Sequence, residues 1–112
     1  MKHWKIATKS KDYGTRGHKL FAVLSYLEDT GAVTYEQLNR FFYNYTRRCK
    51  KNKFYTGKKF NKVRDRGYIG SNLYGGYIGR YVQKTMSPHY YHINSEGIVK
   101  LNELAKKFKG LY

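Results

Sequence analysis

The chain has 112 residues, of which 23 are Lys or Arg and 7 are Asp or Glu, giving a formal net charge of +16. This length fits one domain, and so large a positive excess calls for a polyanionic partner: nucleic acid first, an anionic membrane surface second. The longest apolar run, Leu20–Leu24, is too short to span a membrane, and residues 1–16 lack the apolar core of a signal peptide, so we expect a cytoplasmic protein.

Catalysis is not expected. Cys49 is the only cysteine, which excludes an internal disulfide and a cysteine-based metal cluster. It lies among cations that favour a thiolate, but we prefer an incidental cysteine to a redox switch. His89 and His92 would point to opposite sides of a strand, so they do not form a joint metal site. Without a phosphate loop, a nucleophile motif or suggestively spaced carboxylates, we predict neither an enzyme nor a cofactor.

The N-terminal half predicts a basic arm followed by two helices. Residues 1–16 form the arm, which either follows a nucleic-acid groove or is a frayed terminus, and residues 17–112 form the domain. Helical spacing of apolar residues predicts a helix over His18–Asp29, with Phe21 at the margin of its buried face and Gly31 as its stop.

The second helix is predicted over Tyr35–Tyr45. Thr34 and Gln37 have the spacing of a capping box at its start. Its apolar residues fall on one face, namely Leu38, Phe41, Phe42 and Tyr45. The connection after Gly31 is short, so the two helices must pack against each other.

A basic run and a third helix come next. The run Arg47–Lys53 has five cations in seven residues, and we interpret it as a loop that contacts phosphates. A short basic helix is then predicted over Phe54–Arg66, with Phe60 and Val63 facing the core. Its exposed side carries Lys58, Asn61, Lys62 and Asp65. Lys can donate to guanine and Asn can pair with adenine, so this side suits base edges.

The C-terminal half predicts extended structure and a last helix. The Gly/Tyr-rich segment Gly67–Tyr81 either forms a small hairpin of its own or supplies tyrosines that cover the core, and we prefer a core role to base stacking for these tyrosines. Strands are predicted over Tyr81–Met86 and His89–Asn94, joined by a Ser87-Pro88 turn. Ser95 is the predicted cap of the last helix, whose buried stripe is Ile98, Leu101, Leu104, Ala105 and Phe108.

Two motifs carry a resemblance to a known family. The segment Val63–Ile69 resembles the end of the recognition helix of winged helix-turn-helix DNA-binding domains, and Tyr91–Gly97 resembles their last wing strand running into the next helix. The resemblance covers His18–Phe108. It implies an α+β fold with a three-helix core, a β-hairpin wing and a C-terminal helix, with the third helix in the major groove.

The predicted DNA-binding residues fall into three groups. The basic loop contributes Arg47, Arg48, Lys50, Lys51 and Lys53, and the third helix contributes Thr56, Lys58, Lys59, Asn61 and Lys62. By the resemblance, the wing tip contributes Lys84, Thr85, Ser87 and His89. The basic insertion before the third helix and the Gly/Tyr segment depart from the family pattern.

The resemblance implies a double-stranded DNA-binding protein in the role of a small transcriptional regulator, and the AT-rich codon types of its commonest residues suggest a phage or mobile element. The alternatives are a structural or packaging protein of a virion, an RNA-binding module, and an inhibitor that grips an acidic host protein. We also predict a weak homodimer through the end of the last helix, Phe108–Tyr112.

Overall fold

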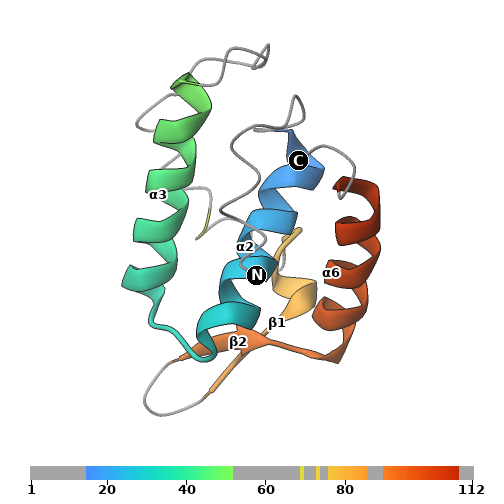
Figure 1. The fold of residues 1–112 in the computed structure, drawn as a ribbon. Coiled ribbons are helices and arrows are strands. Elements are labelled where there is room, and N and C mark those ends of the chain that lie inside the picture. The colour runs from blue at the N-terminus through green and yellow to red at the C-terminus, as the bar shows by residue number, and fades with distance from the viewer. Residues whose placement is uncertain (1–14, 52–68, 70–72, 74–75, 86–89, 109–112) are drawn as a thin grey trace.

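The described part of the chain folds into three α-helices that stand over a two-stranded antiparallel hairpin in the computed structural model (Figure 1). The structure describes residues 15–51, 69, 73, 76–85 and 90–108. The elements are, in chain order, α2 (Arg16–Thr30), α3 (Tyr35–Lys51), the 3-10 helix η2 (Gly79–Tyr81), β1 (Val82–Lys84), β2 (Tyr91–Ile93) and α6 (Ser95–Phe108). Helix α2 lies between α3 and α6 and packs against both, so the chain is a small α+β domain organised around α2.

Helix α2 ends at the predicted glycine. The Thr15 hydroxyl caps its start by accepting a hydrogen bond from the His18 N–H at 3.4 Å. Gly31 has a φ of 80°, and its N–H donates to the Leu27 carbonyl at 2.9 Å, which confirms the stop. The marginal position predicted for Phe21 is wrong: its side chain is fully buried, because α3, α6 and β2 cover α2 from several sides.

The start and inner face of α3 are confirmed. The Gln37 N–H donates to the Thr34 hydroxyl at 3.1 Å, and the Thr34 N–H donates to the Gln37 side-chain carbonyl at 2.9 Å, which completes the capping box. The side chains that α3 buries in the core are Leu38, Phe41, Phe42 and Tyr45, as predicted.

The end of α3 differs from the prediction. The helix continues past Tyr45 to Lys51, so the basic run Arg47–Lys51 is not a loop but the last turns of a helix. The run contains neither Gly nor Pro, and Arg and Lys are good helix formers. Cations near a helix C-terminus also interact favourably with the partial negative charge there. The helix therefore extends until Lys51, the last residue before the undescribed segment.

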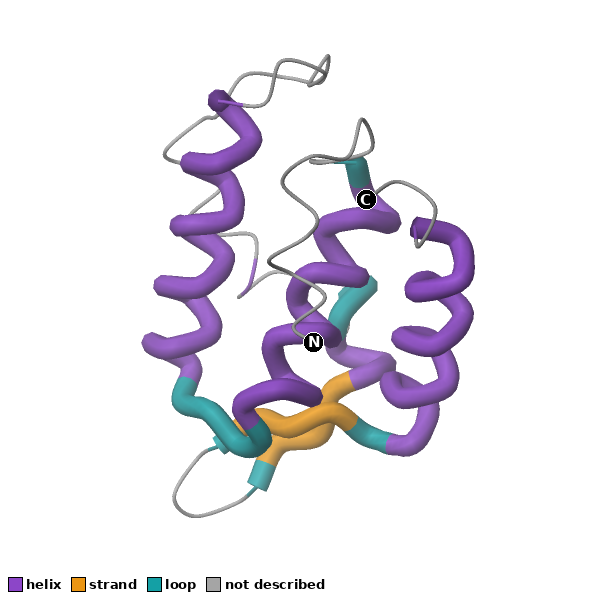
Figure 2. The backbone as a smooth tube through the Cα atoms, viewed as in Figure 1, coloured by secondary structure: helices purple, strands orange, loops and turns teal. Residues whose placement is uncertain are grey.

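The hairpin is tied to the connection between α2 and α3. Val82 pairs with Ile93, and Lys84 pairs with Tyr91, in an antiparallel register. Val33 forms an isolated bridge to Tyr91 through two hydrogen bonds, of 2.9 and 2.7 Å, so the chain between α2 and α3 runs beside β2 (Figure 2). Tyr91 is buried and Ile93 packs against the core, as the alternation predicts.

The described part of the Gly/Tyr-rich segment is helical rather than extended. Residues 76–81 form a turn and the 3-10 helix η2, so Tyr77 and Tyr81 do not form a hairpin, and the predicted first strand starts at Val82 instead of Tyr81. Tyr77 and Tyr81 are partly buried against the core, which supports the core role preferred for them. Ile69, Leu73 and Ile78 add buried side chains from the same segment.

Helix α6 buries Leu101, Leu104 and Phe108 and packs Ala105 against the core, as predicted, but its cap and the first residue of its buried stripe differ from the prediction. Asn94, not Ser95, is the cap: its side-chain oxygen accepts a hydrogen bond from the Gly97 N–H at 2.7 Å. Ile98 is 47% exposed and does not belong to the buried stripe. The buried residues of α6 are Gly97, Leu101, Leu104 and Phe108. Phe108 is 1% exposed and belongs to the core, whereas the other residues of the predicted dimer contact, 109–112, lie outside the described residues. The stripe starts at Gly97 because a residue without a side chain fits closest to η2 and β2, and this sets the rotation of α6.

Candidate nucleic-acid interface

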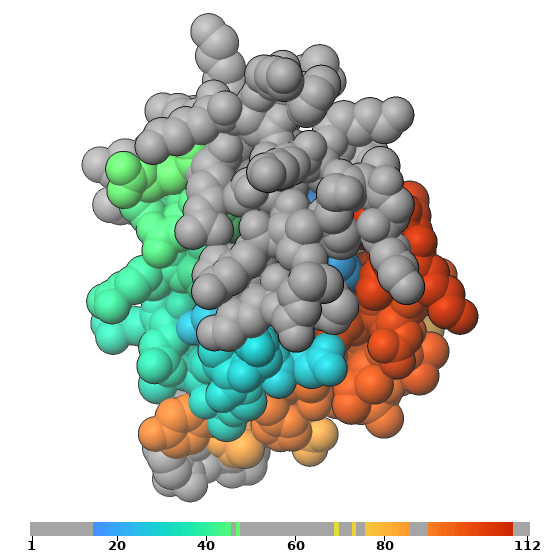
Figure 3. Space-filling model, viewed as in Figure 1, coloured from blue at the N-terminus to red at the C-terminus, as the bar shows by residue number. Residues whose placement is uncertain are grey.

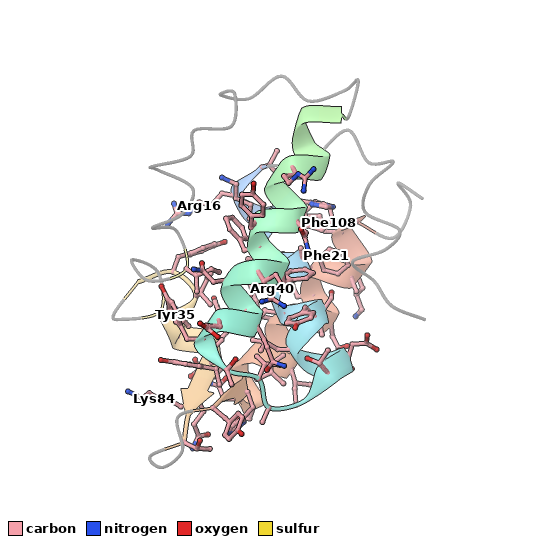
Figure 4. The ribbon with its side chains drawn as sticks, turned by 90° about the vertical axis from the view of Figure 1, so that its left-hand side faces the viewer. Arg16, Phe21, Tyr35, Arg40, Lys84 and Phe108 are labelled. Carbon is pink, nitrogen blue, oxygen red and sulfur yellow. The ribbon has the colours of Figure 1, made fainter. Side chains whose placement is uncertain are left out.

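The outer side of α3 carries polar and basic side chains in fixed positions. Since four side chains of α3 are held in the core, the opposite side must face solvent. We call this surface the α3 outer face and define it by four exposed residues: Arg40, Tyr43, Asn44 and Arg47. At about 100° per residue, Arg40 and Arg47 point within about 20° of each other. Figure 4 looks onto α3 and shows Arg40 near the middle of the view.

The α3 outer face is free of carboxylates beyond the first turn. Glu36 is the acidic residue of that turn, where it complements the positive end of the helix. From Gln37 to Lys51 the helix has five cations and no Asp or Glu. The described cations of the α3 outer face, Arg40 and Arg47, therefore have no carboxylate between them in the helix.

The aromatic ring of Tyr43 lies within this basic surface. Its side chain is 42% exposed, and the Arg47 guanidinium carbon lies 5.9 Å from the ring centroid. An arginine at this distance is attracted by the ring and is held over it. The Tyr43 ring and the Arg47 guanidinium are thus neighbours on the α3 outer face.

The predicted phosphate-binding run is in a helix. Arg47 is exposed on the α3 outer face, and Arg48, Lys50 and Lys51 occupy the following helical positions. Helical positions have a defined spacing of about 1.5 Å per residue along the axis. The prediction that this run is a loop is therefore wrong for its part up to Lys51.

Of the four predicted wing residues, the structure describes Lys84 and Thr85. Lys84 is exposed at the end of β1. The Thr85 hydroxyl accepts a hydrogen bond from the Tyr90 N–H at 2.9 Å, and the Thr85 N–H donates to the Tyr90 carbonyl at 2.8 Å. Thr85 thus closes the hairpin below its tip. Ser87 and His89 lie outside the described residues.

The predicted third helix, Phe54–Arg66, also lies outside the described residues. This applies to all of its predicted DNA contacts and to the end of the basic run: Lys53, Thr56, Lys58, Lys59, Asn61 and Lys62. Their positions relative to the α3 outer face remain sequence-based predictions.

The described site residues lie at opposite ends of α3. The bridge between Val33 and Tyr91 holds the hairpin beside the start of α3, whereas Arg47 lies near its end. A helix from Tyr35 to Lys51 is about 24 Å long. Lys84 and Arg47 are therefore not one cluster, and the α3 outer face is the surface that extends between them (Figure 4).

Three residues of the α3 outer face are absent from the predicted site, namely Arg40, Tyr43 and Asn44. The predicted binding residues all follow Tyr45, the predicted end of this helix. The wheel fixed by the four apolar residues already placed these side chains outward, and the lack of carboxylates after Glu36 was a usable signal.

A buried polar pair behind α3 was also not predicted. The His18 Nδ1 atom lies 2.7 Å from the Tyr45 hydroxyl, and both side chains are buried. The His18 ring also packs edge-on against Phe21 and Phe108, so it lies where α2, α3 and α6 meet. Burial lowers the pKa of His18 from 6.5 to about 4, because the apolar surroundings disfavour the charged ring. This pair is inside the core and belongs to the scaffold of the site.

Comparison with known proteins adds no partner or activity: no family model, no curated protein and no solved structure matches the chain. Within the described ranges, no helix combines the length and apolar character needed to cross a membrane. The described side chains also contain no group of three or more His, Cys, Asp or Glu positioned to hold a metal ion.

Proposed function

We propose that the chain is a double-stranded DNA-binding protein that contacts the duplex with the α3 outer face. The observation that carries this proposal is the outer side of α3, which from Gln37 to Lys51 has five cations and no carboxylate, in a chain of net charge +16. Phosphate neutralisation by Lys and Arg supplies much of the affinity of any DNA-binding protein. The fixed helical geometry adds the positioning that a disordered basic segment lacks.

The dimensions of α3 suit a duplex groove. The major groove is about 12 Å wide and admits an α-helix. A helix of about 24 Å is long enough to lie in the groove and extend beyond it at both ends. In that pose Arg40 and Asn44 would face base edges, where Arg pairs with guanine and Asn with adenine. Arg47 and the cations after it would reach phosphates.

The alternative of an anionic membrane surface is less well supported. A helix that binds at a membrane surface needs an exposed apolar side to insert between the lipids. The apolar side of α3 is occupied by the core, since Leu38, Phe41, Phe42 and Tyr45 are all less than 9% exposed. Its outer side offers Tyr43 beside the charges but no continuous apolar stripe.

The winged helix-turn-helix assignment and the role of a small phage or mobile-element regulator are part of this proposal. The described order of two helices, a hairpin and a capped helix is compatible with that fold. In that fold the predicted third helix would occupy the major groove, with Asn61 and Lys62 reading bases and the hairpin reaching phosphates, and the α3 outer face would instead lie along the backbone beside the groove. A packaging protein would use the same charge without sequence choice, and an RNA-binding module would prefer unpaired bases.

A titration of duplex DNA, single-stranded DNA and RNA at two salt concentrations tests the proposal. We expect duplex DNA to bind most tightly, and the affinity to fall steeply as salt rises, with a slope of about −0.9 per neutralised phosphate. A large ratio between a selected duplex and random duplex would favour a regulator over a packaging protein. Tighter binding of RNA, or affinity independent of salt, would contradict the proposal.

Matched double variants test the surface itself. Replacing Arg40 and Arg47 with Ala should lower duplex affinity at least about tenfold and reduce the salt slope by about two units. The control replaces Arg80 and Lys106 with Ala, which removes the same charge from exposed positions on η2 and α6. We expect the control to retain most of the affinity. Equal losses for both double variants would show that net charge, rather than the α3 outer face, binds the duplex.

A further inference from the structure

Tyr43 brings an aromatic ring into the middle of the α3 outer face. Its side chain is 42% exposed, and among the described residues of α3 it is the exposed large hydrophobic side chain. At about 100° per residue, Tyr43 points within about 60° of both Arg40 and Arg47. Figure 3 shows the side chains of α3 at the surface, along one edge of the molecule. A ligand that covers the two arginines therefore also covers the Tyr43 ring.

The Tyr43 ring favours an apolar group on the ligand. Taking the ring out of water is favourable against an apolar group, whereas a phosphate in the same place would lose part of its own hydration. In the major groove of a duplex, the apolar group that side chains contact is the 5-methyl group of thymine. The ring thus distinguishes between the two kinds of DNA surface that a basic helix can meet, the groove floor and the phosphate backbone.

The residue after Tyr43 fits the same base pair. Asn44 is exposed, and an asparagine amide pairs with adenine, the partner of thymine. The Cα atoms of consecutive residues are about 3.8 Å apart, so the two side chains can reach one A·T pair or two neighbouring pairs. Arg40 and Arg47 lie about 4.5 Å before and about 6 Å after Tyr43 along the helix axis, where they flank this position.

We propose that Tyr43 contacts the 5-methyl group of a thymine and makes the α3 outer face selective for duplex DNA that carries thymine at this position. The inference rests on the proposed function, in the pose in which α3 lies in the major groove. If α3 lay along the backbone instead, the methyl group would be out of reach of the ring.

Two duplexes that differ only in their thymine methyl groups test the contact. The probes are a short duplex of alternating A·T pairs and the same duplex with deoxyuridine at every thymidine position, titrated at one salt concentration. Both carry the same charge and the same hydrogen-bonding groups, and every register of the first offers a thymine methyl group to α3. We expect the wild type to bind the thymidine duplex about fourfold more tightly, the ratio that corresponds to burial of one methyl group.

Substitutions at Tyr43 assign this ratio to the ring. Tyr43→Ser removes the ring and should bind the two duplexes equally, whereas Tyr43→Phe keeps the ring and should keep the ratio. Tyr90→Ser is the matched control, because Tyr90 is 36% exposed but lies next to β2 rather than on α3. It should also keep the ratio. Thermal unfolding checks that each variant folds, and Tyr43→Gln takes the place of Tyr43→Ser if that variant does not.

Equal affinity of the wild type for the two duplexes, or a ratio that is the same in Tyr43→Ser, would overturn the thymine contact. If duplex binding still depended on Arg40 and Arg47, the proposed function would stand, with α3 placed along the backbone. A wild type that binds neither duplex would contradict both the thymine contact and the proposed function.

Discussion

Gly97→Ala is expected to lower the free energy of unfolding by about 2–3 kcal/mol, the cost of overpacking a closely fitted contact. A Cβ at this position would lie 2.5 Å from Cγ1 of Ile93 and would overlap the backbone carbonyl oxygen of Tyr81. A backbone atom cannot move aside as a flexible side chain can. The start of α6 would have to shift away from η2 and β2, which also disturbs the hydrogen bond between the Gly97 N–H and Asn94.

Gly17→Ala is the control for Gly97→Ala, since both substitutions add one methyl group to a helical glycine. At Gly17 the new Cβ would meet the Phe108 ring at 3.6 Å, which is an ordinary contact distance. Ala is the better helix former by about 0.5–1 kcal/mol, so this variant should be slightly more stable than the wild type. Denaturant unfolding of both variants measures the difference. Unchanged stability of Gly97→Ala would show that α6 does not pack as closely as described.

Acidification is expected to destabilise the fold through His18. The pKa of this ring is about 4 in the folded chain and about 6.5 when it is solvated, so the unfolded chain binds the proton more tightly. Its contribution to stability is therefore complete above pH 6.5 and is lost as the pH falls toward 4. The linkage relation gives a loss of about 2 kcal/mol at pH 5 and about 3 kcal/mol at pH 4.

Comparing the wild type with His18→Gln isolates this loss from the titration of carboxylates. Gln retains a polar side chain that can accept a hydrogen bond from Tyr45, but it has no titratable ring. As the pH falls from 7 to 4, the wild type should lose more unfolding free energy than His18→Gln does. Any advantage of the wild type at pH 7 should therefore shrink. Parallel pH profiles would mean that His18 is not buried in its neutral form.

Local signals of the sequence were sufficient for the stop of α2 and the cap of α3. Gly31 ends α2 through its positive φ, and Thr34 with Gln37 starts α3, because each feature depends on residues only a few positions apart. The alternation in Tyr91–Ile93 likewise predicted which side chains of this strand face the core. Lys84 and Thr85 lie at the end of the hairpin, below the tip to which the resemblance assigned them.

Features that depend on the meeting of distant elements were missed. A run of cations such as Arg47–Lys51 fits both a loop and a helix end, so the length of α3 was underestimated. Gly97 has no hydrophobic side chain that would mark it as buried, so the first position of the buried stripe of α6 was assigned to Ile98 instead. Phe21 and His18 are buried because three helices converge on them, which no periodicity within α2 records.

The contrast between local signals and contacts of distant elements also explains which residues of the candidate site were predicted. Clusters of charge were recognised after Tyr45, whereas Arg40 and Asn44 are single polar residues within an amphipathic pattern that is typical of a supporting helix. Their importance follows from the fold, in which α3 lies at one edge with its outer side exposed and with no carboxylate along it after Glu36.

An NMR titration of the isotope-labelled wild-type chain with a short DNA duplex tests the central claim most directly, because it locates the contact without changing the protein. The account predicts that the amide signals of Arg40, Asn44 and Arg47 shift on addition of duplex, together with that of Lys84 at the hairpin. The signals of Val99, Asn102 and Lys106 on α6 should stay in place. Shifts confined to α6, or an α3 outer face whose signals do not respond to saturating duplex, would contradict it.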